Sequence, residues 1–146
     1  MIIDQKLLNE LSAQAKANPR LRQSYDLRNS ENDNSQRMLN ALEPGTVMPV
    51  HRHMKTSESI AMIRGKMAMR LYDDHGTITN EFVMAPASSV TEPVTEPVEV
   101  VEVPMVQVEV GQWHSLEVLE EGTVVFEAKD GKYEALKEEE LMKLNI

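Results

Sequence analysis

Two histidines and one glutamate, close together in the sequence, constrain this chain more than any other feature. Residues 45–65 contain His51, His53 and Glu58. Side chains alternate between the two faces of a β-strand, so in a strand His51 and His53 would lie on one face and could reach one ion. The polar residues 55–57 predict a turn, after which a return strand would bring the Glu58 carboxylate beside the two imidazoles. This stretch therefore predicts a metal site on a β-hairpin.

A fourth ligand would complete such a site, and the chain contains two further histidines. His75 lies in the turn pattern of residues 73–76, where an exposed side chain is commoner than a metal ligand. His114 follows the alternating run of residues 106–110 and the tripeptide Gly111-Gln112-Trp113, so a tight turn would carry it onto a neighbouring strand. We therefore predict that the metal ligands are His51, His53, Glu58 and His114.

The spacing of these residues resembles the first motif of the cupin superfamily. In that motif a glycine, a His-x-His pair, a glutamate and a second glycine follow one another at set intervals, which are matched here by Gly45, His51, His53, Glu58 and Gly65. The second cupin motif is matched by Gly111 and His114, whereas Glu109 replaces its proline and Val118 its asparagine. The resemblance implies a mainly β fold, the double-stranded β-helix or jelly-roll barrel, with room inside for a ligand.

Longer stretches of the chain resemble the WbuC family of small cupin-fold metalloproteins. The stretches are residues 18–22, 36–45, 111–114 and 122–131, and the likeness spans nearly the whole chain except residues 87–103. This resemblance implies a role in polysaccharide or O-antigen metabolism, with a sugar or nucleotide sugar as the small-molecule ligand. It also implies a homodimer.

Three imidazoles and one carboxylate suit one divalent transition metal ion, which could be Fe, Mn, Ni, Co, Cu or Zn. The chain has no cysteine, so thiolate ligands and disulfides are excluded. Two functions lead: a metal-dependent isomerase, epimerase or oxygenase (dioxygenase) type of enzyme, and a non-catalytic module that binds or senses a small molecule. A purely structural metal site ranks last, because structural sites are usually closed and rich in thiolates. As a metal ligand, Glu58 would be a poor catalytic base, so the candidates are Tyr25, Arg37 and a metal-bound hydroxide.

Several other side chains are candidate contacts for the bound molecule. Arg37 lies within a predicted strand, on the wet face or paired inside the cavity, and the resemblance favours the cavity. Trp113 adjoins a predicted ligand, where an indole packs in a core or stacks on a sugar ring. Arginines usually lie on a solvated face, but guanidinium groups also bind phosphate or carboxylate through paired hydrogen bonds. That alternative applies to Arg20, Arg22 and Arg28.

The remaining sequence fits one cupin domain of 146 residues. Leucines at helical spacing predict an N-terminal helix capped by Asp4 and ending near Ala17, followed by a loop to residue 35. The barrel is expected over residues 36–131, with Met62, Met67, Met69 and Met84 in its core. Two Val-Thr-Glu-Pro repeats predict an inserted loop at about residues 87–103, because each proline removes a strand donor. Residues 132–146 predict a short helical tail.

Charge and hydropathy restrict the partners. The chain has 15 Lys and Arg against 24 Asp and Glu, a net charge of −9, and no basic run. Such a chain lacks the positive surface that nucleic-acid backbones require. No apolar stretch approaches the ~18 residues that span a bilayer, and the N-terminus lacks the pattern of a secretory signal. We therefore expect a cytoplasmic protein that binds neither nucleic acid nor membrane.

Overall fold

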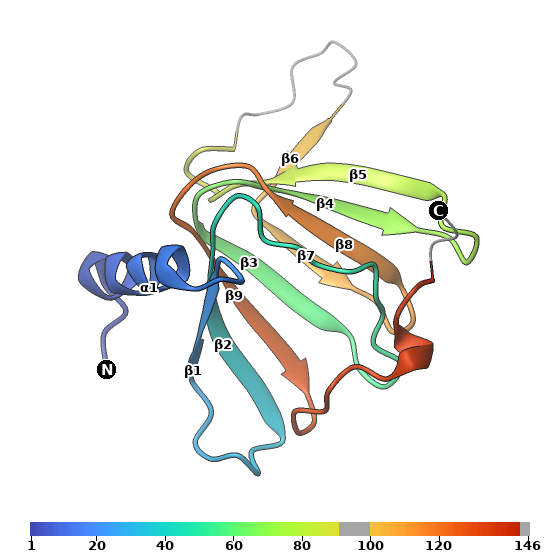
Figure 1. The fold of residues 1–146 in the computed structure, drawn as a ribbon, viewed down its shortest axis with the longest axis horizontal. Helices are drawn as coiled ribbons and strands as arrows, with labels where there is room; N and C mark the ends of the chain where they lie inside the picture. Colours follow the sequence, from blue (N-terminus) through green and yellow to red (C-terminus); the bar gives the residue numbers. More distant parts are fainter. Residues whose placement is uncertain (91–99, 144–146) are drawn as a thin grey trace.

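The computed structural model describes residues 1–90 and 100–143. In these residues two β-sheets face each other, with one helix beside them (Figure 1). One sheet has the order β1-β2-β9-β3-β7 and the other the order β6-β5-β4-β8. The strands are β1 Arg22–Asp26, β2 Ser35–Leu42, β3 Glu58–Arg64, β4 Met67–Tyr72, β5 Ile78–Met84, β6 Val101–Val103, β7 Met105–Val108, β8 Trp113–Val118 and β9 Thr123–Asp130. The mainly β prediction is confirmed.

The predicted N-terminal helix is α1, Gln5–Ala17. The Asp4 carboxylate accepts a hydrogen bond from the Leu7 amide at 3.0 Å, which satisfies one of the free donors at the helix start. The apolar side of α1 packs on the outer face of the five-stranded sheet through Leu8, Leu11, Ala15, Leu39, Ala41 and Val124. Arg64 on β3 fixes the helix by donating to Asn9 Oδ1 at 2.8 Å and to Ser12 Oγ at 2.9 Å.

The main core lies between the two sheets. It contains the four methionines predicted for it, Met62, Met67, Met69 and Met84, all of them buried. β4 and β5 form a hairpin, with Met67 opposite Met84 and Met69 opposite Phe82. Their unbranched thioether chains fit the irregular gaps of this core.

Three local predictions need correction. Residues 47–57 do not form a regular strand, and within them only His51 makes a β-bridge. The predicted insertion is too long at its C-terminal end, because Val101–Val103 pairs in parallel with β5. Residues 91–99, with nearly all of the repeat, lie outside the described part. The predicted C-terminal helix is one turn of 3-10 helix, η1, Glu138–Glu140.

The segment around η1 crosses the mouth of the barrel and holds the histidine-bearing stretch. The Met142 amide donates to Val50 O at 2.9 Å, and the Arg52 amide donates to Glu140 O at 3.0 Å.

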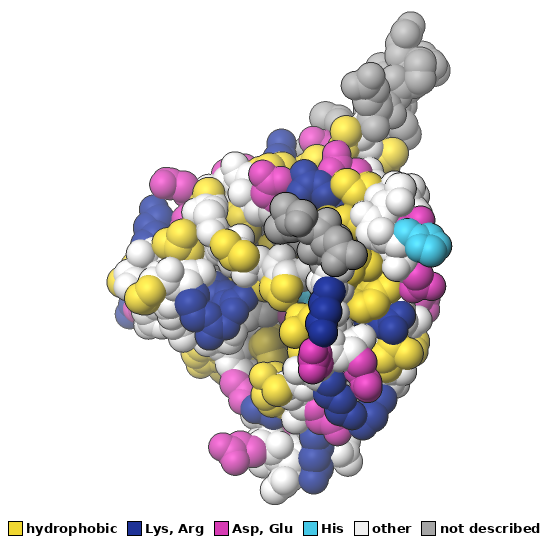
Figure 2. Space-filling model, turned by 45° about the vertical axis from the view of Figure 1, so that its right-hand side comes forward, with side chains coloured by type: hydrophobic (Ala, Val, Ile, Leu, Met, Phe, Trp, Pro, Cys, Tyr) yellow, Lys and Arg dark blue, Asp and Glu magenta, His cyan; other side chains and the backbone are white. Residues whose placement is uncertain are grey.

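Among the described residues no helix is long and apolar enough to cross a membrane. On the face shown in Figure 2, acidic and basic side chains are intermixed.

Candidate metal centre

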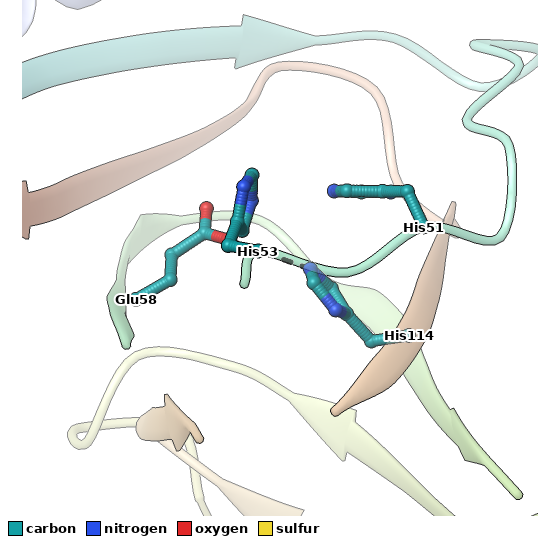
Figure 3. A group of neighbouring side chains, drawn as sticks. All are labelled: His51, His53, Glu58 and His114. Atoms are coloured by element: carbon teal, nitrogen blue, oxygen red, sulfur yellow. Dashed lines mark ion pairs between the residues drawn. The ribbon is translucent and has the colours of Figure 1, made fainter. Parts of the chain in front are cut away.

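The structure brings His51, His53, Glu58 and His114 together at the mouth of the barrel (Figure 3). One potential ligand atom from each side chain lies within 4.8 Å of all the others. Ligands that bind a metal at about 2.1 Å lie at most about 4.2 Å apart, so an ion would need only sub-ångström adjustments. The sequence prediction of this cluster therefore agrees with the geometry.

Backbone pairing sets the positions of two of these histidines. The His51 amide donates to His114 O at 3.1 Å, and the His114 amide donates back to His51 O at 2.9 Å. This short antiparallel bridge places the two imidazoles side by side, with ring centroids 4.3 Å apart. His53 is held next to them because its carbonyl accepts from the Gly111 amide at 2.8 Å. Glu58 begins β3, where it lies opposite Val108 of β7 and Lys129 of β9.

Backbone carbonyls also orient two of the rings. Nδ1 of His51 lies 2.9 Å from Pro49 O, and Nδ1 of His114 lies 2.9 Å from Gln112 O. A carbonyl oxygen only accepts hydrogen bonds, so Nδ1 of each ring must carry the proton. The Nε2 lone pair of each neutral ring is then free, as in metal-binding histidines.

Two polar atoms in the cluster are buried without a hydrogen-bond partner in the described structure. They are His53 Nε2 and Glu58 Oε2, which lie 3.1 Å apart. His114 Nε2 lies 3.4 Å from the same carboxylate oxygen. Buried polar atoms left without a hydrogen-bond partner are destabilising. A shared cation would satisfy them all, so these residues fit a metal ion.

The charges of the cluster suit metal binding. Burial alone would raise the pKa of Glu58, but the imidazoles of His114 and His53, with Lys129, outweigh it and hold this pKa well below its usual range. Burial and the neighbouring His114 and His53 lower the pKa of His51 to about 4. Near neutral pH the carboxylate is therefore ionised and the His51 ring is neutral, which are the forms that coordinate metals.

A cavity of about 320 Å³ adjoins the four side chains. Its wall includes polar residues that the sequence analysis did not select, namely Ser24, Asn40, Glu127, Lys129, Tyr133 and Glu134. Alternation along β9 was an available signal, since Val124 and Phe126 pack toward α1 while Glu127 and Lys129 face the cavity. To assign these faces from the sequence, one must know that β9 lies beside β3, which no local pattern indicates.

Three predicted ligand contacts or catalytic residues do not line this cavity. Tyr25 packs against the apolar residues between α1 and the five-stranded sheet, on the opposite face of β1 from Ser24. The prediction that Arg37 faces the cavity is wrong, because its guanidinium donates to Asp33 Oδ2 at 3.0 Å on the other face of β2. The Trp113 indole is stacked 4.2 Å from the Arg52 guanidinium and donates to Asp74 at 3.0 Å, away from His114.

Of the four remaining candidate residues, two line the cavity and two do not. His75 is exposed and lies apart from the cluster. Arg28 pairs with Asp26 at 2.8 Å and does not line the cavity, whereas Arg20 and Arg22 do. Two of the three arginines considered for an anion pocket are therefore at the cavity wall.

Glu127 gives the cavity a pH-dependent contribution to stability. Burial and the negative charge of Glu58 raise the pKa of Glu127 to about 8. The native state therefore keeps a proton that the unfolded chain releases above about pH 4.5, and the free energy of unfolding should fall as the pH rises from there to about 8. In metal-free protein we expect Glu127→Gln to raise this free energy by about 1–2 kcal/mol at pH 8 and little at pH 5.

Urea unfolding of the metal-free protein at both pH values measures this effect. Glu10→Gln, at an exposed position of α1, is the matched control and should follow the wild type. Equal stabilisation by Glu127→Gln at pH 5 and pH 8 would contradict the role of the proton.

Comparison with known proteins gives a family and a fold. A family model described as "Domain of unknown function (DUF6016)" matches residues 3–84, more than half of the chain, including three of the four clustered residues. No curated protein matches the chain. The fold matches several solved structures, all at identities that support the fold alone.

KdgF from Halomonas sp. matches with a TM-score of 0.52 and 11% identity, over 80% of this chain and 84% of that one. Oxalate decarboxylase from Bacillus subtilis matches with a TM-score of 0.52 and 20% identity, over 84% of this chain and 27% of that one. One study of that enzyme concerns its Mn(II) centres. CapF, solved with 3-isopropenyl-tropolone, matches with a TM-score of 0.51 and 21% identity, over 70% and 26%.

The chain thus spans about a quarter of the length of oxalate decarboxylase and CapF. With these matches the cupin fold is established, as the first motif predicts. The finer resemblance to the WbuC family stays a prediction.

Proposed function

Since the chain belongs to the DUF6016 family, whose description assigns no activity, we propose its function from its own side chains: it binds one divalent metal ion and, with it, a small molecule. His51, His53, Glu58 and His114 are the proposed ligands. The observation that carries this proposal is the pair of buried, unpartnered atoms, His53 Nε2 and Glu58 Oε2. Free histidine nitrogens and an ionised carboxylate suit a first-row transition ion.

The cavity beside these ligands is where the small molecule would bind. Its volume of about 320 Å³ is at the lower end for small-molecule sites, so the ligand is a small metabolite. When bound, the ion would supply a Lewis acid that polarises oxygen atoms of this ligand. The cavity wall also includes Asn40 and Ser24, which can hydrogen-bond this ligand, and the apolar side chains of Ile60 and Leu116.

Within this proposal we favour an enzyme, because the cavity wall also carries a group that can move a proton. Glu127 lies there, and a carboxyl group at the cavity wall can accept or donate a proton. An isomerase, epimerase or oxygenase acting on a sugar-like ligand is the form that the WbuC resemblance implies. The alternative is a non-catalytic binding or sensing module, which would bind the same ligands without turnover.

Metal titration tests the proposal directly. Protein stripped with a chelator is expected to bind one Co²⁺ per chain, with visible absorption bands typical of mixed nitrogen and oxygen ligands. Mn²⁺, Ni²⁺ and Zn²⁺ should compete for the same site, with relative affinities that follow the donor set. Failure to bind Co²⁺, or weak binding at several sites without these bands, would overturn it.

The remaining properties inferred from resemblance and composition stay predictions. They are the role in polysaccharide or O-antigen metabolism, the homodimer and the cytoplasmic location. Size-exclusion chromatography with light scattering measures the oligomeric state independently of metal content.

A further inference from the structure

We propose that the ligand of this cavity carries an oxyanion, a phosphate or a carboxylate, which Arg20 and Arg22 bind while the rest of the molecule faces the metal centre. This inference rests on the proposed function for the metal half of the site. It names the chemical class of the ligand, which the metal cluster alone does not.

The first observation is that these two arginines lack carboxylate partners within residues 1–90 and 100–143. Of the five other arginines, Arg64 donates to uncharged side chains of α1, and the remaining four pair with a carboxylate: Arg28, Arg37, Arg52 and Arg70. The chain contains 24 acidic residues against 15 basic ones, so partners are plentiful. Two guanidinium groups that keep no carboxylate in such a protein, both at the wall of one cavity, are available to an anion from outside.

The second observation concerns the orientation of Arg22. Arg22 and Ser24 lie on the cavity face of β1, since alternate residues of a strand share a face and both line the cavity. The Arg22 Nη1 contact is the Met48 sulfur, at 2.9 Å, on the facing loop. A thioether is a weak acceptor, so within the described residues the Arg22 guanidinium has no strong acceptor, and its N–H groups can donate to an oxyanion.

The charge of the whole cavity points the same way. Lys129 is a third cation in its wall. The acidic groups there are Glu58, Glu127 and Glu134, of which Glu58 is a proposed metal ligand and Glu134 is paired with Lys55 at 3.1 Å. With a divalent ion bound, positive charge in the cavity exceeds negative charge. Positive groups gathered in a concave site favour anionic ligands.

Binding measurements with three probes test this inference. We expect inorganic phosphate and succinate, but not glucose, to bind the Co²⁺-loaded protein, as measured by calorimetry and by perturbation of the Co²⁺ absorption bands. Arg22→Ala is expected to weaken binding of whichever anion binds more tightly by at least ~10-fold, because a charge-assisted hydrogen-bond pair is lost. Arg20→Ala should weaken it in the same direction. Phosphate and succinate together distinguish a phosphorylated from a carboxylated ligand.

Arg28→Ala is the matched control, since Arg28 lies in the same region of the chain but pairs with Asp26 outside the cavity. The affinity of the Arg28→Ala variant for the anions should equal that of the wild type. The inference is overturned if neither anion binds, if glucose binds as tightly as the anions, or if Arg22→Ala and Arg20→Ala both bind them normally. Co²⁺ stoichiometry is measured separately in every variant. A protein that takes up no Co²⁺ refutes the proposed function, whereas normal uptake without anion binding refutes only this inference.

Discussion

Replacing His114 with alanine is expected to lower the metal content of the purified protein at least ~10-fold, and His51→Ala should do the same. Each of these imidazoles is fixed by a carbonyl on Nδ1, so its Nε2 is prepared to coordinate. Loss of one of four ligands leaves an incomplete shell that water must fill. Elemental analysis after dialysis against the metal, together with the Co²⁺ spectrum, measures the effect.

The control for both variants is His75→Ala. His75 is exposed and apart from the cluster, so this variant removes a histidine without removing a proposed ligand. The bridge between His51 and His114 is made by backbone atoms, so both alanine variants should keep the fold, which circular dichroism can verify. Full metal stoichiometry in both variants would end the proposed assignment.

Gly65→Ala is expected to have the largest effect on stability, lowering the free energy of unfolding by about 3 kcal/mol or more. Gly65 has a φ of +87°, which L-residues with a side chain rarely adopt. An added Cβ would also lie 2.3 Å from Thr123 Oγ1 and 2.6 Å from Thr123 Cα. Since Thr123 is fully buried at the start of β9, neither it nor its backbone can move aside easily.

Gly131→Ala separates the two causes of this effect. Gly131 has a similar φ of +82°, but an added Cβ would meet no atom within 4 Å. Its replacement should therefore cost only the backbone term, about 1 kcal/mol. Urea unfolding of both variants gives the difference. Equal losses would mean that the close approach of Thr123 contributes nothing, and that the glycine is needed for its φ alone.

The sequence predicts the metal cluster and the helix well because both depend on short-range patterns. The spacing of His51, His53 and Glu58 and the cap at Asp4 are visible within a few residues. The four methionines of the core were also predictable from strand alternation and composition. Local order along the chain identifies these residues, whereas the bridge between His51 and His114 joins distant parts of the chain.

The cavity wall was not predictable, because it depends on which face of each strand turns inward. Adjacent residues of a strand point to opposite faces, so an error of one position reverses the assignment. Arg37 and Trp113 were predicted to contact the bound molecule. The cavity is instead lined by the next residue of each strand, Met38 and the predicted metal ligand His114. Only the pairing of β2 with β9 and of β4 with β8 fixes these faces, and that pairing joins distant parts of the chain.

The backbone around His51 has a consequence for the order in which the protein matures. His51 is bridged both to His114 and to Leu141, so its imidazole is held by residues that leave the ribosome long after it. Contacts of such large sequence separation form late in folding. During synthesis the proposed four-ligand site therefore cannot assemble until the segment that carries His114 has emerged from the ribosome.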